Sequence, residues 1–317
     1  MQLEEHDTGV RDPETVRKTL DEVERLQKSM RVCDQAGNPL ATVYYDPDTG
    51  DVREIHTEYY ENVEKEAEHS DELVYCTDYE GNITSEKLTR KQVREKEHPY
   101  LVVTSLLFHG DDVLLQQRSK EKEIDPDALS SSAHGVAKQI FTEDGKLITD
   151  MRRVAFTNAA LEINEELRHG KDTKPFNVKI FPGNERELLQ YLYAEKIDDP
   201  NTVYLVSPVV FPGYGYPFKR HQNHRTRFIT MGHISSKSKP DISLDKAEVA
   251  EIEWCPLDKF VEQKNMTADV RSCLETMYER FLRQRTHWGF HHSHRWVMNK
   301  MQRLFGSYPD WEDPGPP

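Results

Sequence analysis

This sequence of 317 residues lacks long apolar runs and has no segment that resembles a secretory signal. A membrane-spanning helix needs about 20 consecutive apolar residues, and no stretch approaches that length. The first residues, MQLEEHDTGVRDPE, are acidic and polar, whereas a secretory signal has a basic start followed by an apolar segment. We therefore expect a soluble, cytoplasmic protein that does not enter a membrane.

Cysteine is also scarce. The four cysteines are far apart, and no two of them form a Cys-x-x-Cys pair; they are Cys33, Cys76, Cys255 and Cys273. Such spacing does not indicate a disulfide framework. We expect buried, reduced side chains.

Positive charge is in deficit, because 42 Lys and Arg face 56 Asp and Glu, which gives a formal net charge of −14. Nearly all of the acidic excess lies in residues 1–100. Sequence-independent binding to nucleic acids depends on many Lys and Arg that neutralise phosphates, so a nucleic-acid polymer is not the expected partner. A hydrophobic content of 36% is sufficient for a sizeable core.

The sequence pattern divides the chain into three parts. Residues 1–70 combine a short helical pattern with β-rich runs around Asp-Pro-Asp-Thr-Gly, which indicates a small β-extension or a dimerisation arm. Residues 71–262 contain the strands and helices of the main domain. Residues 263–317 form a C-terminal part that is largely helical to about residue 305 and then rich in proline and glycine.

The main domain begins with a β-rich run from Glu72, and its central sheet starts with two apolar strands around Gly-Asp-Asp at residues 110–112, which is a strong hairpin signal. A helix is predicted over residues 150–169, where an apolar stripe at helical spacing would seat it on the sheet; the stripe is Phe156, Ala160, Ile163 and Leu167. A second helix is expected around residues 185–193, followed by strands that end near residue 257.

Glu162, Glu165 and Glu166 are the most informative residues, because their spacing places three carboxylates on one face of the first helix. Three like charges at this distance repel one another. A hard divalent cation such as Mg²⁺ prefers oxygen ligands and would offset the repulsion. The alternative is that they form the solvated face of a surface helix.

With its segments in order, the chain resembles the Nudix hydrolases. Residues 159–167, AALEINEEL, are similar to the helical half of that family's fingerprint, which reads Arg-Glu-apolar-x-Glu-Glu-x-Gly. Residues 113–135, VLLQQRSKEKEIDPDALSSSAHG, resemble the strand, the "L-x-Q-x-R-S" run and the small-residue turn that lead to the fingerprint glycine, Gly135.

The resemblance implies an α/β/α sandwich around a mixed sheet and hydrolysis of a diphosphate linkage with Mg²⁺ or Mn²⁺. The implied substrate is a small molecule, usually a nucleoside diphosphate derivative. Glu165 and Glu166 are the expected metal ligands, and Glu162 is a third ligand or the base that orients water. A further catalytic carboxylate often follows the helix in this family, and Glu251 is the favoured candidate beside Glu248 and Glu253; exposed charges on an edge strand are the alternative.

Substrate contacts are expected from basic and aromatic residues. Arg118 ends the QQRS run, and residues 214–228 combine tyrosines with a cluster of cations, which suits a loop that stacks a base and binds phosphate. The candidates are Arg118, Tyr214, Lys219, Arg220 and Arg225. A surface loop with an excess of charge is the alternative, and a homodimer remains open.

Departures from the family pattern leave two alternatives. Leu161 stands where the fingerprint has arginine, Arg168 stands at its second glycine, and about a dozen extra residues separate Gly135 from Glu162, with Glu143 among them as an alternative upstream glutamate. These differences suit a catalytically degenerate module that binds a ligand or a protein. Isopentenyl diphosphate isomerase has a similar layout, and residues 88–93 resemble it, but its cysteine is replaced by residues 130–134, SSSAH.

Overall fold

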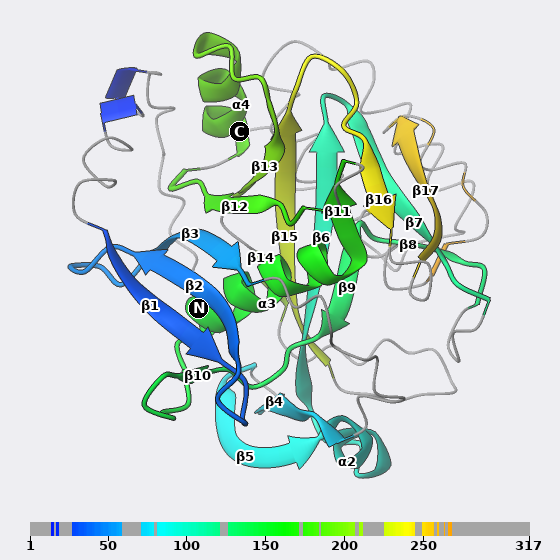
Figure 1. Ribbon diagram of the computed structural model, residues 1–317. Coiled ribbons are helices and arrows are strands. Elements are labelled where there is room, and N and C mark those ends of the chain that lie inside the picture. The colour runs from blue at the N-terminus through cyan, green and yellow to red at the C-terminus, as the bar shows by residue number, and fades with distance from the viewer. Residues whose placement is uncertain are drawn as a thin grey trace, which may run out of the picture.

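The computed structural model describes residues 14–15, 17–18, 27–58, 71–78, 81–120, 126–170, 174–183, 185–206, 209–211, 225–244, 249–256, 259, 263 and 266–267. Strand residues far outnumber helical residues in this part of the chain (Figure 1). The mixed α/β class with a large mixed sheet, as expected from the sequence, is confirmed. No helix among these residues is long and apolar enough to cross a membrane.

Most strands belong to one sheet with the order β10-β1-β2-β3-β12-β13-β15-β6-β4-β5, and β7, β8, β9, β14 and β17 branch from it. The strands are β1 (Lys28–Cys33), β2 (Pro39–Tyr45), β3 (Val52–Thr57), β4 (Leu73–Thr77), β5 (Ile83–Thr89), β6 (Tyr100–His109), β7 (Asp112–Arg118), β8 (Leu129–Ser130), β9 (Ala133–Val136), β10 (Phe141–Thr142), β12 (Asn177–Ile180), β13 (Asp199–Leu205), β14 (Val209–Phe211), β15 (Arg225–Ser235) and β17 (Val249–Pro256). Two short strands, β11 (Leu167–His169) and β16 (Ile242–Leu244), pair separately.

The sheet is mixed because two of its neighbouring pairs run parallel. Strands β6 and β15 form a long parallel pair, and β12 pairs in parallel with β13. The predicted hairpin of β6 and β7 is confirmed, with Gly110 at a φ of 60° in its turn. A positive φ costs little only for glycine, which explains this residue at the tight turn.

The N-terminal strands are continuous with the rest of the sheet. Strand β3 pairs with β12, and β1 pairs with β10, which lies within the extra residues between Gly135 and Glu162. Val43 and Ile55 from these strands are fully buried in the same hydrophobic cluster as Phe156 of the central helix. The strands of the predicted extension therefore share their core with the main domain.

Helix α3 (Met151–Glu166) lies at the centre of the molecule (Figure 1). It packs against β2 and β3 on one side and against β6 and β9 on another, so residues around most of its circumference are buried. The predicted stripe is buried, and strands cover the helix on a second side as well. The helix also ends three residues before the predicted end, where Leu167 begins β11.

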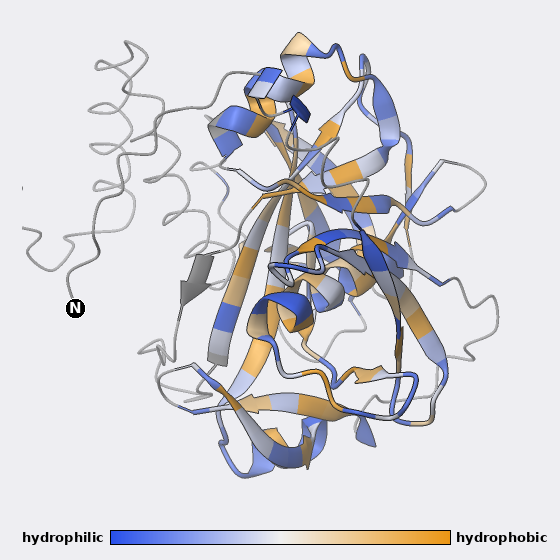
Figure 2. Ribbon diagram, turned by 90° about the vertical axis from the view of Figure 1, so that its left-hand side faces the viewer, coloured by the Kyte–Doolittle hydropathy of each residue, from blue (hydrophilic) through white to orange (hydrophobic). Residues whose placement is uncertain are grey.

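Two further helices are short. Helix α4 (Glu185–Ala194) confirms the prediction near residue 185, and Leu188 and Leu192 on one side of it pack against Phe181 and Val206. Figure 2 shows hydrophobic and hydrophilic residues side by side on α4, whereas the long strands carry many hydrophobic residues. Helix α2 (Arg90–Glu95) was not predicted.

Some predictions fall on residues outside the described ranges. The N-terminal helical pattern and the helical region after residue 258 lie there almost entirely. Cys33, Cys76 and Cys255 are buried and free, as expected, and Cys273 is among the residues not described.

Candidate metal and catalytic site

Two buried asparagines fix helix α3 to its neighbours. The Asn158 side chain accepts a hydrogen bond from the backbone N of Lys138 at 2.9 Å and donates one to the Lys138 carbonyl at 3.2 Å. The Asn164 side chain makes the same pair of bonds with the backbone of Phe176, at 2.6 Å and 3.0 Å. Asp150 caps the start of the helix by accepting a bond from the Arg153 N. The last turn, which carries the three glutamates, is therefore held in place from several sides.

Glu162 packs directly on Gly135 of strand β9. A Cβ atom at position 135 would lie 2.0 Å from both Cδ and Oε1 of Glu162, a distance that no real side chain tolerates. Gly135 therefore leaves space that the Glu162 carboxylate fills. The fingerprint glycine and the first helical glutamate, which are 27 positions apart in the printed sequence, touch in the structure.

Glu166 is oriented by two donors from the strands that precede the helix. Its Oε2 atom accepts a hydrogen bond from Nε2 of Gln116 on β7 at 3.0 Å and one from the backbone N of His134 on β9 at 3.2 Å. The Gln116 amide also donates to the Ser132 carbonyl. This network leaves the Glu166 carboxylate in a defined orientation.

Glu165 pairs with Lys138, which follows β9. The Lys138 ammonium donates to Oε1 of Glu165, and only 14% of the lysine side chain is exposed. Burial by itself lowers the pKa of Lys138, but the negative charges of Glu165, Glu72 and Glu162 outweigh it and raise that pKa. Leu161, the residue before Glu162, is buried, so the cation beside these glutamates comes from the segment after β9.

Glu162 lies in an environment that disfavours its charged form. Burial first, and then the charges of Glu165 and Glu166, raise the pKa of Glu162 well above its ordinary value, although Lys138 and Arg90 act in the opposite direction. Nearby negative charge of this kind disfavours the ionised carboxylate until a cation arrives. The three carboxylates offer the oxygen donors that a hard divalent cation such as Mg²⁺ prefers. Their oxygens do not all converge within 4.8 Å of one another in this structure, so the side chains would have to rotate to bind one ion together.

Glu251, expected as a further catalytic carboxylate, is not brought to this cluster. It lies opposite Gln117 in the β7–β17 pair, whereas Gln116, which contacts Glu166, lies opposite Ile252. Side chains alternate between the two faces of a strand, so Glu251 points to the opposite face from Gln116. Glu251 and Glu253 are both exposed. This favours the alternative of exposed charges on an edge strand.

Glu143 is also placed elsewhere. It forms an ion pair with Arg31 of β1 at 3.5 Å, and 64% of its side chain is exposed. The extra residues between Gly135 and Glu162 therefore connect to the N-terminal strands.

Among the predicted substrate residues that the structure describes, Arg118 lies on β7, the strand that contacts Glu166 through Gln116. It lies two positions after Gln116 on β7 and thus on the same face of that strand. Arg225 begins β15, where its backbone lies opposite Tyr100. Tyr214, Lys219 and Arg220, like Glu248, lie outside the described residues.

Sequence reasoning missed four residues of the site, namely Gln116, His134, Lys138 and Arg90. Gln116 and His134 stand in the very segment that resembles the fingerprint approach, and Lys138 follows Gly135 closely, so proximity to the motif was the available signal. Arg90 had no such signal. Its Nε atom is buried and has no hydrogen-bond partner among the described residues.

No model of a protein family matches the chain. No curated protein matches it either.

Solved structures that resemble it include the protein DR0079 from Deinococcus radiodurans, at 15% identity and a TM-score of 0.40, covering 65% of this chain and 99% of that one. A MutT NUDIX hydrolase from Burkholderia pseudomallei has 13% identity and a TM-score of 0.31, over 56% and 96% of the two chains. The NUDIX domain of Shewanella oneidensis NrtR, complexed with ADP ribose, has 14% identity and a TM-score of 0.30, over 57% and 87%. Two of these three structures are described as NUDIX proteins, the family that the sequence motifs resemble. Sequence identities of 13–15% and TM-scores of 0.30–0.40 assign no activity to this chain.

Proposed function

We propose that this protein is a Nudix-type hydrolase that uses Mg²⁺ or Mn²⁺ to cleave a diphosphate linkage in a small molecule, such as a nucleoside diphosphate derivative. Glu162, Glu165 and Glu166 would hold the metal. The observation that carries the proposal is the contact of the Glu162 carboxylate with Gly135, at a position where a side chain would displace it, together with the charges of Glu165 and Glu166 close by.

Other residues would orient the metal ligands, bind the substrate phosphate and accept a proton. Gln116 and the backbone N of His134 hold Glu166 in one orientation, and Arg118, on the same face of β7, would bind a substrate phosphate. A bound divalent cation would neutralise diphosphate charge and lower the pKa of a coordinated water. Glu162, whose pKa is raised, is the candidate to accept a proton from the attacking water if it is not a ligand.

The test is release of phosphate or nucleotide from a panel of ADP-ribose, dinucleotides, nucleotide sugars and nucleoside triphosphates, with isopentenyl diphosphate as an isomerase control. We expect turnover of at least one compound with Mg²⁺ or Mn²⁺, and a loss of about 100-fold or more in Glu166→Gln. Glu253→Gln is the matched control, because Glu253 is exposed on β17 away from Gln116. Equal turnover in Glu166→Gln and wild type would exclude the proposed role of the cluster.

A second candidate is a module that binds a diphosphate compound without cleaving it. The ion pair between Lys138 and Glu165 favours it, because the lysine already offsets one of the three negative charges. This candidate predicts that ADP-ribose or a nucleotide sugar binds to the protein in the absence of divalent metal, and that Glu166→Gln leaves its Kd unchanged. Metal-dependent turnover in the panel would exclude it.

A further inference from the structure

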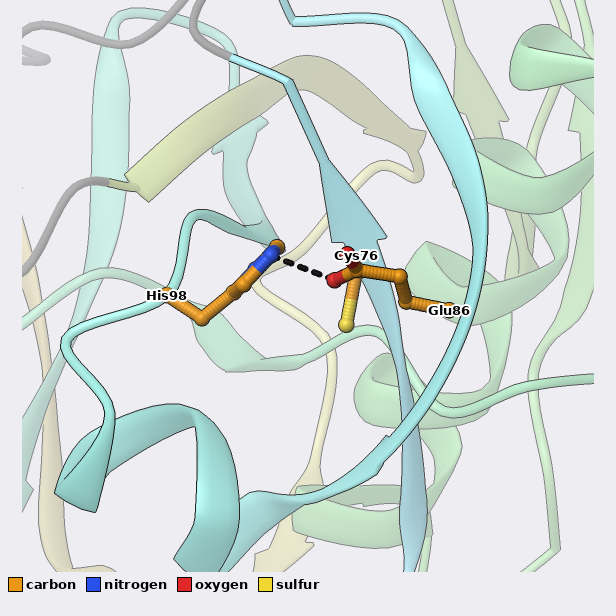
Figure 3. Close-up of side chains that lie close together, drawn as sticks. All are labelled: Cys76, Glu86 and His98. Carbon is orange, nitrogen blue, oxygen red and sulfur yellow. Dashed lines mark ion pairs between the residues drawn. The ribbon is translucent and has the colours of Figure 1, made fainter.

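A second group of side chains of the types that bind metals lies where β4, β5 and helix α2 meet. Strands β4 and β5 stand at one end of the strand order of the sheet. The ligand atoms of Cys76, Glu86 and His98 all lie within 4.8 Å of one another. Figure 3 shows the three side chains converging from β4, from β5 and from the segment after α2, with His98 paired to Glu86. None of these residues takes part in the carboxylate cluster on α3.

Local backbone features fix each of the three side chains. Cys76 lies where the β4–β5 register shifts between Tyr75 and Thr77, an irregularity that re-aims the side chain between regular pairs. His98 lies three residues after the last residue of α2. The helix begins with a capping box between Thr89 and Gln92, which determines where the turn starts.

The end of α2 is equally well defined. The backbone N of His98 donates to the Val93 carbonyl at 2.9 Å, and the N of Glu97 donates to the Arg94 carbonyl, which together form a Schellman motif. Glu97 has a φ of 52°, in the left-handed region that this motif requires. The backbone of His98 is therefore positioned by the helix end.

The His98 ring is oriented as it would be in a metal site. Its Nδ1 atom lies 2.9 Å from the Pro99 carbonyl, and a carbonyl oxygen can only accept, so Nδ1 carries the proton. Without a metal, Nε2 donates to Glu86 in the ion pair, and loss of that proton would leave a lone pair on Nε2, the atom that faces Glu86 and Cys76. A backbone carbonyl that fixes the tautomer in this way is typical of histidines that bind metal.

We propose that Cys76, Glu86 and His98 form a zinc site, with the fourth position open to water. A thiolate, an imidazole and a carboxylate are ligands that Zn²⁺ accepts, whereas Mg²⁺ prefers oxygen alone. One thiolate and one carboxylate also balance the two charges of the ion. A neutral unit of this kind suits the apolar surroundings of Cys76, which is buried with Val93 and Tyr100.

The geometry requires only a small adjustment. Ligand atoms on a tetrahedral zinc lie about 3.5 Å apart, so a group spread over 4.8 Å closes by about 1 Å, which side-chain rotation supplies. The Glu86 side chain is 51% exposed and the His98 side chain 24%, which gives the ion access from the surface. Burial raises the pKa of Cys76 to about 11, so zinc binding would release the thiol proton.

The site would also support the carboxylate cluster indirectly. Gln139 donates its side-chain amide to the carbonyls of Val74 on β4 and Glu86 on β5, and its neighbour is Lys138, the partner of Glu165. Zinc at the β4–β5 unit would thus stiffen the segment that places Lys138. This role does not depend on hydrolase activity.

The test is metal binding by the full-length protein. We expect about one zinc per chain by plasma mass spectrometry after dialysis, and a thiolate-to-cobalt absorption band when Co²⁺ alone is added to the metal-free protein. Cys76→Ser should abolish the band. His98→Gln and Glu86→Gln, which alter partly exposed side chains and leave the core intact, should each weaken Co²⁺ binding at least about 10-fold.

The controls separate this site from the rest of the molecule. Cys33→Ser, at another buried free cysteine, should keep the band, and Glu166→Gln should keep it too because that residue belongs to the other cluster. A band that persists in Cys76→Ser, or the absence of any band in the wild type, would overturn the proposal. The three residues would then be an ion pair beside an inert thiol.

Discussion

The position of the Glu162 carboxylate depends on the absence of a side chain at Gly135. A glycine in the middle of a strand normally weakens it, because it packs no side chain and costs conformational entropy. Here the missing side chain is the feature that matters, since the carboxylate of Glu162 occupies that volume. The position demands glycine for reasons of contact rather than of backbone conformation.

Gly135→Ala should therefore impair metal binding more than folding. The new methyl would displace the Glu162 carboxylate, which is the far end of a flexible side chain, so we expect a loss of at least about 10-fold in Mg²⁺ affinity by calorimetry and a loss of stability of about 1 kcal/mol. Gly232→Ala is the control. Its methyl would meet Leu107 at 2.6 Å in the core and should destabilise the protein without reducing Mg²⁺ affinity. The opposite ranking of the two variants would contradict this account.

Residues of the site could be predicted from sequence where their relation is local. The three glutamates share one helix face through spacing alone, so their grouping follows from helix geometry. Gln116 and Lys138 reach the cluster through strand pairing and helix packing over long sequence distances, which spacing does not reveal. The face on which Glu251 lies could not be predicted for the same reason, because the register of β17 against β7 decides it.

At the scale of the elements, side-chain amides join helix α3 to the segments around it. Asn158 and Asn164 are both buried, and each binds the backbone of a single neighbouring residue through both its oxygen and its nitrogen. Periodicity predicted where α3 lies and most of its length. It could not predict that β2 and β3 cover a second side, because that depends on the pairing of β3 with β12.

Asn158→Ala should lower the free energy of unfolding by about 2–4 kcal/mol, since it leaves buried backbone groups of Lys138 without their partners. Urea unfolding measures this. Asn164→Ala removes an equivalent pair of bonds to Phe176 and should destabilise to a similar degree. Only Asn158→Ala should also change Mg²⁺ affinity, because only that variant releases the Lys138 segment. Unchanged affinity in both would refute the link between Lys138 and the cluster.

At the scale of the whole molecule, the N-terminal strands and the main domain share one sheet and one core. The mixed sheet was expected from the sequence because the motifs around Gly135 and Glu162 resemble those of a family with such a sheet. The pairing of β3 with β12 could not be predicted, because the apolar pattern of a strand does not specify which other strand it pairs with. The pairing of β10 with β1 explains where the extra residues before α3 go.

Removal of residues 1–70 should abolish cooperative folding. It would expose Val178 on β12 and Phe156 on α3, both fully buried in the cluster that contains Val43 and Ile55. Near-ultraviolet circular dichroism and thermal unfolding of the shortened chain are the measurements, and addition of residues 1–70 as a separate peptide should restore part of the signal. A sharp transition in the shortened chain alone would show that the extension is a separate domain.

The junction of β3 and β12 has a consequence for synthesis on the ribosome. Glu54 of β3 pairs with Lys179 of β12, which is translated about 120 residues later. At typical elongation rates of about 5–20 residues per second, the hairpin of β2 and β3 would wait about 6–24 s with an unpaired edge. A nascent chain of this kind would be a natural client for chaperones that shield β-edges during translation.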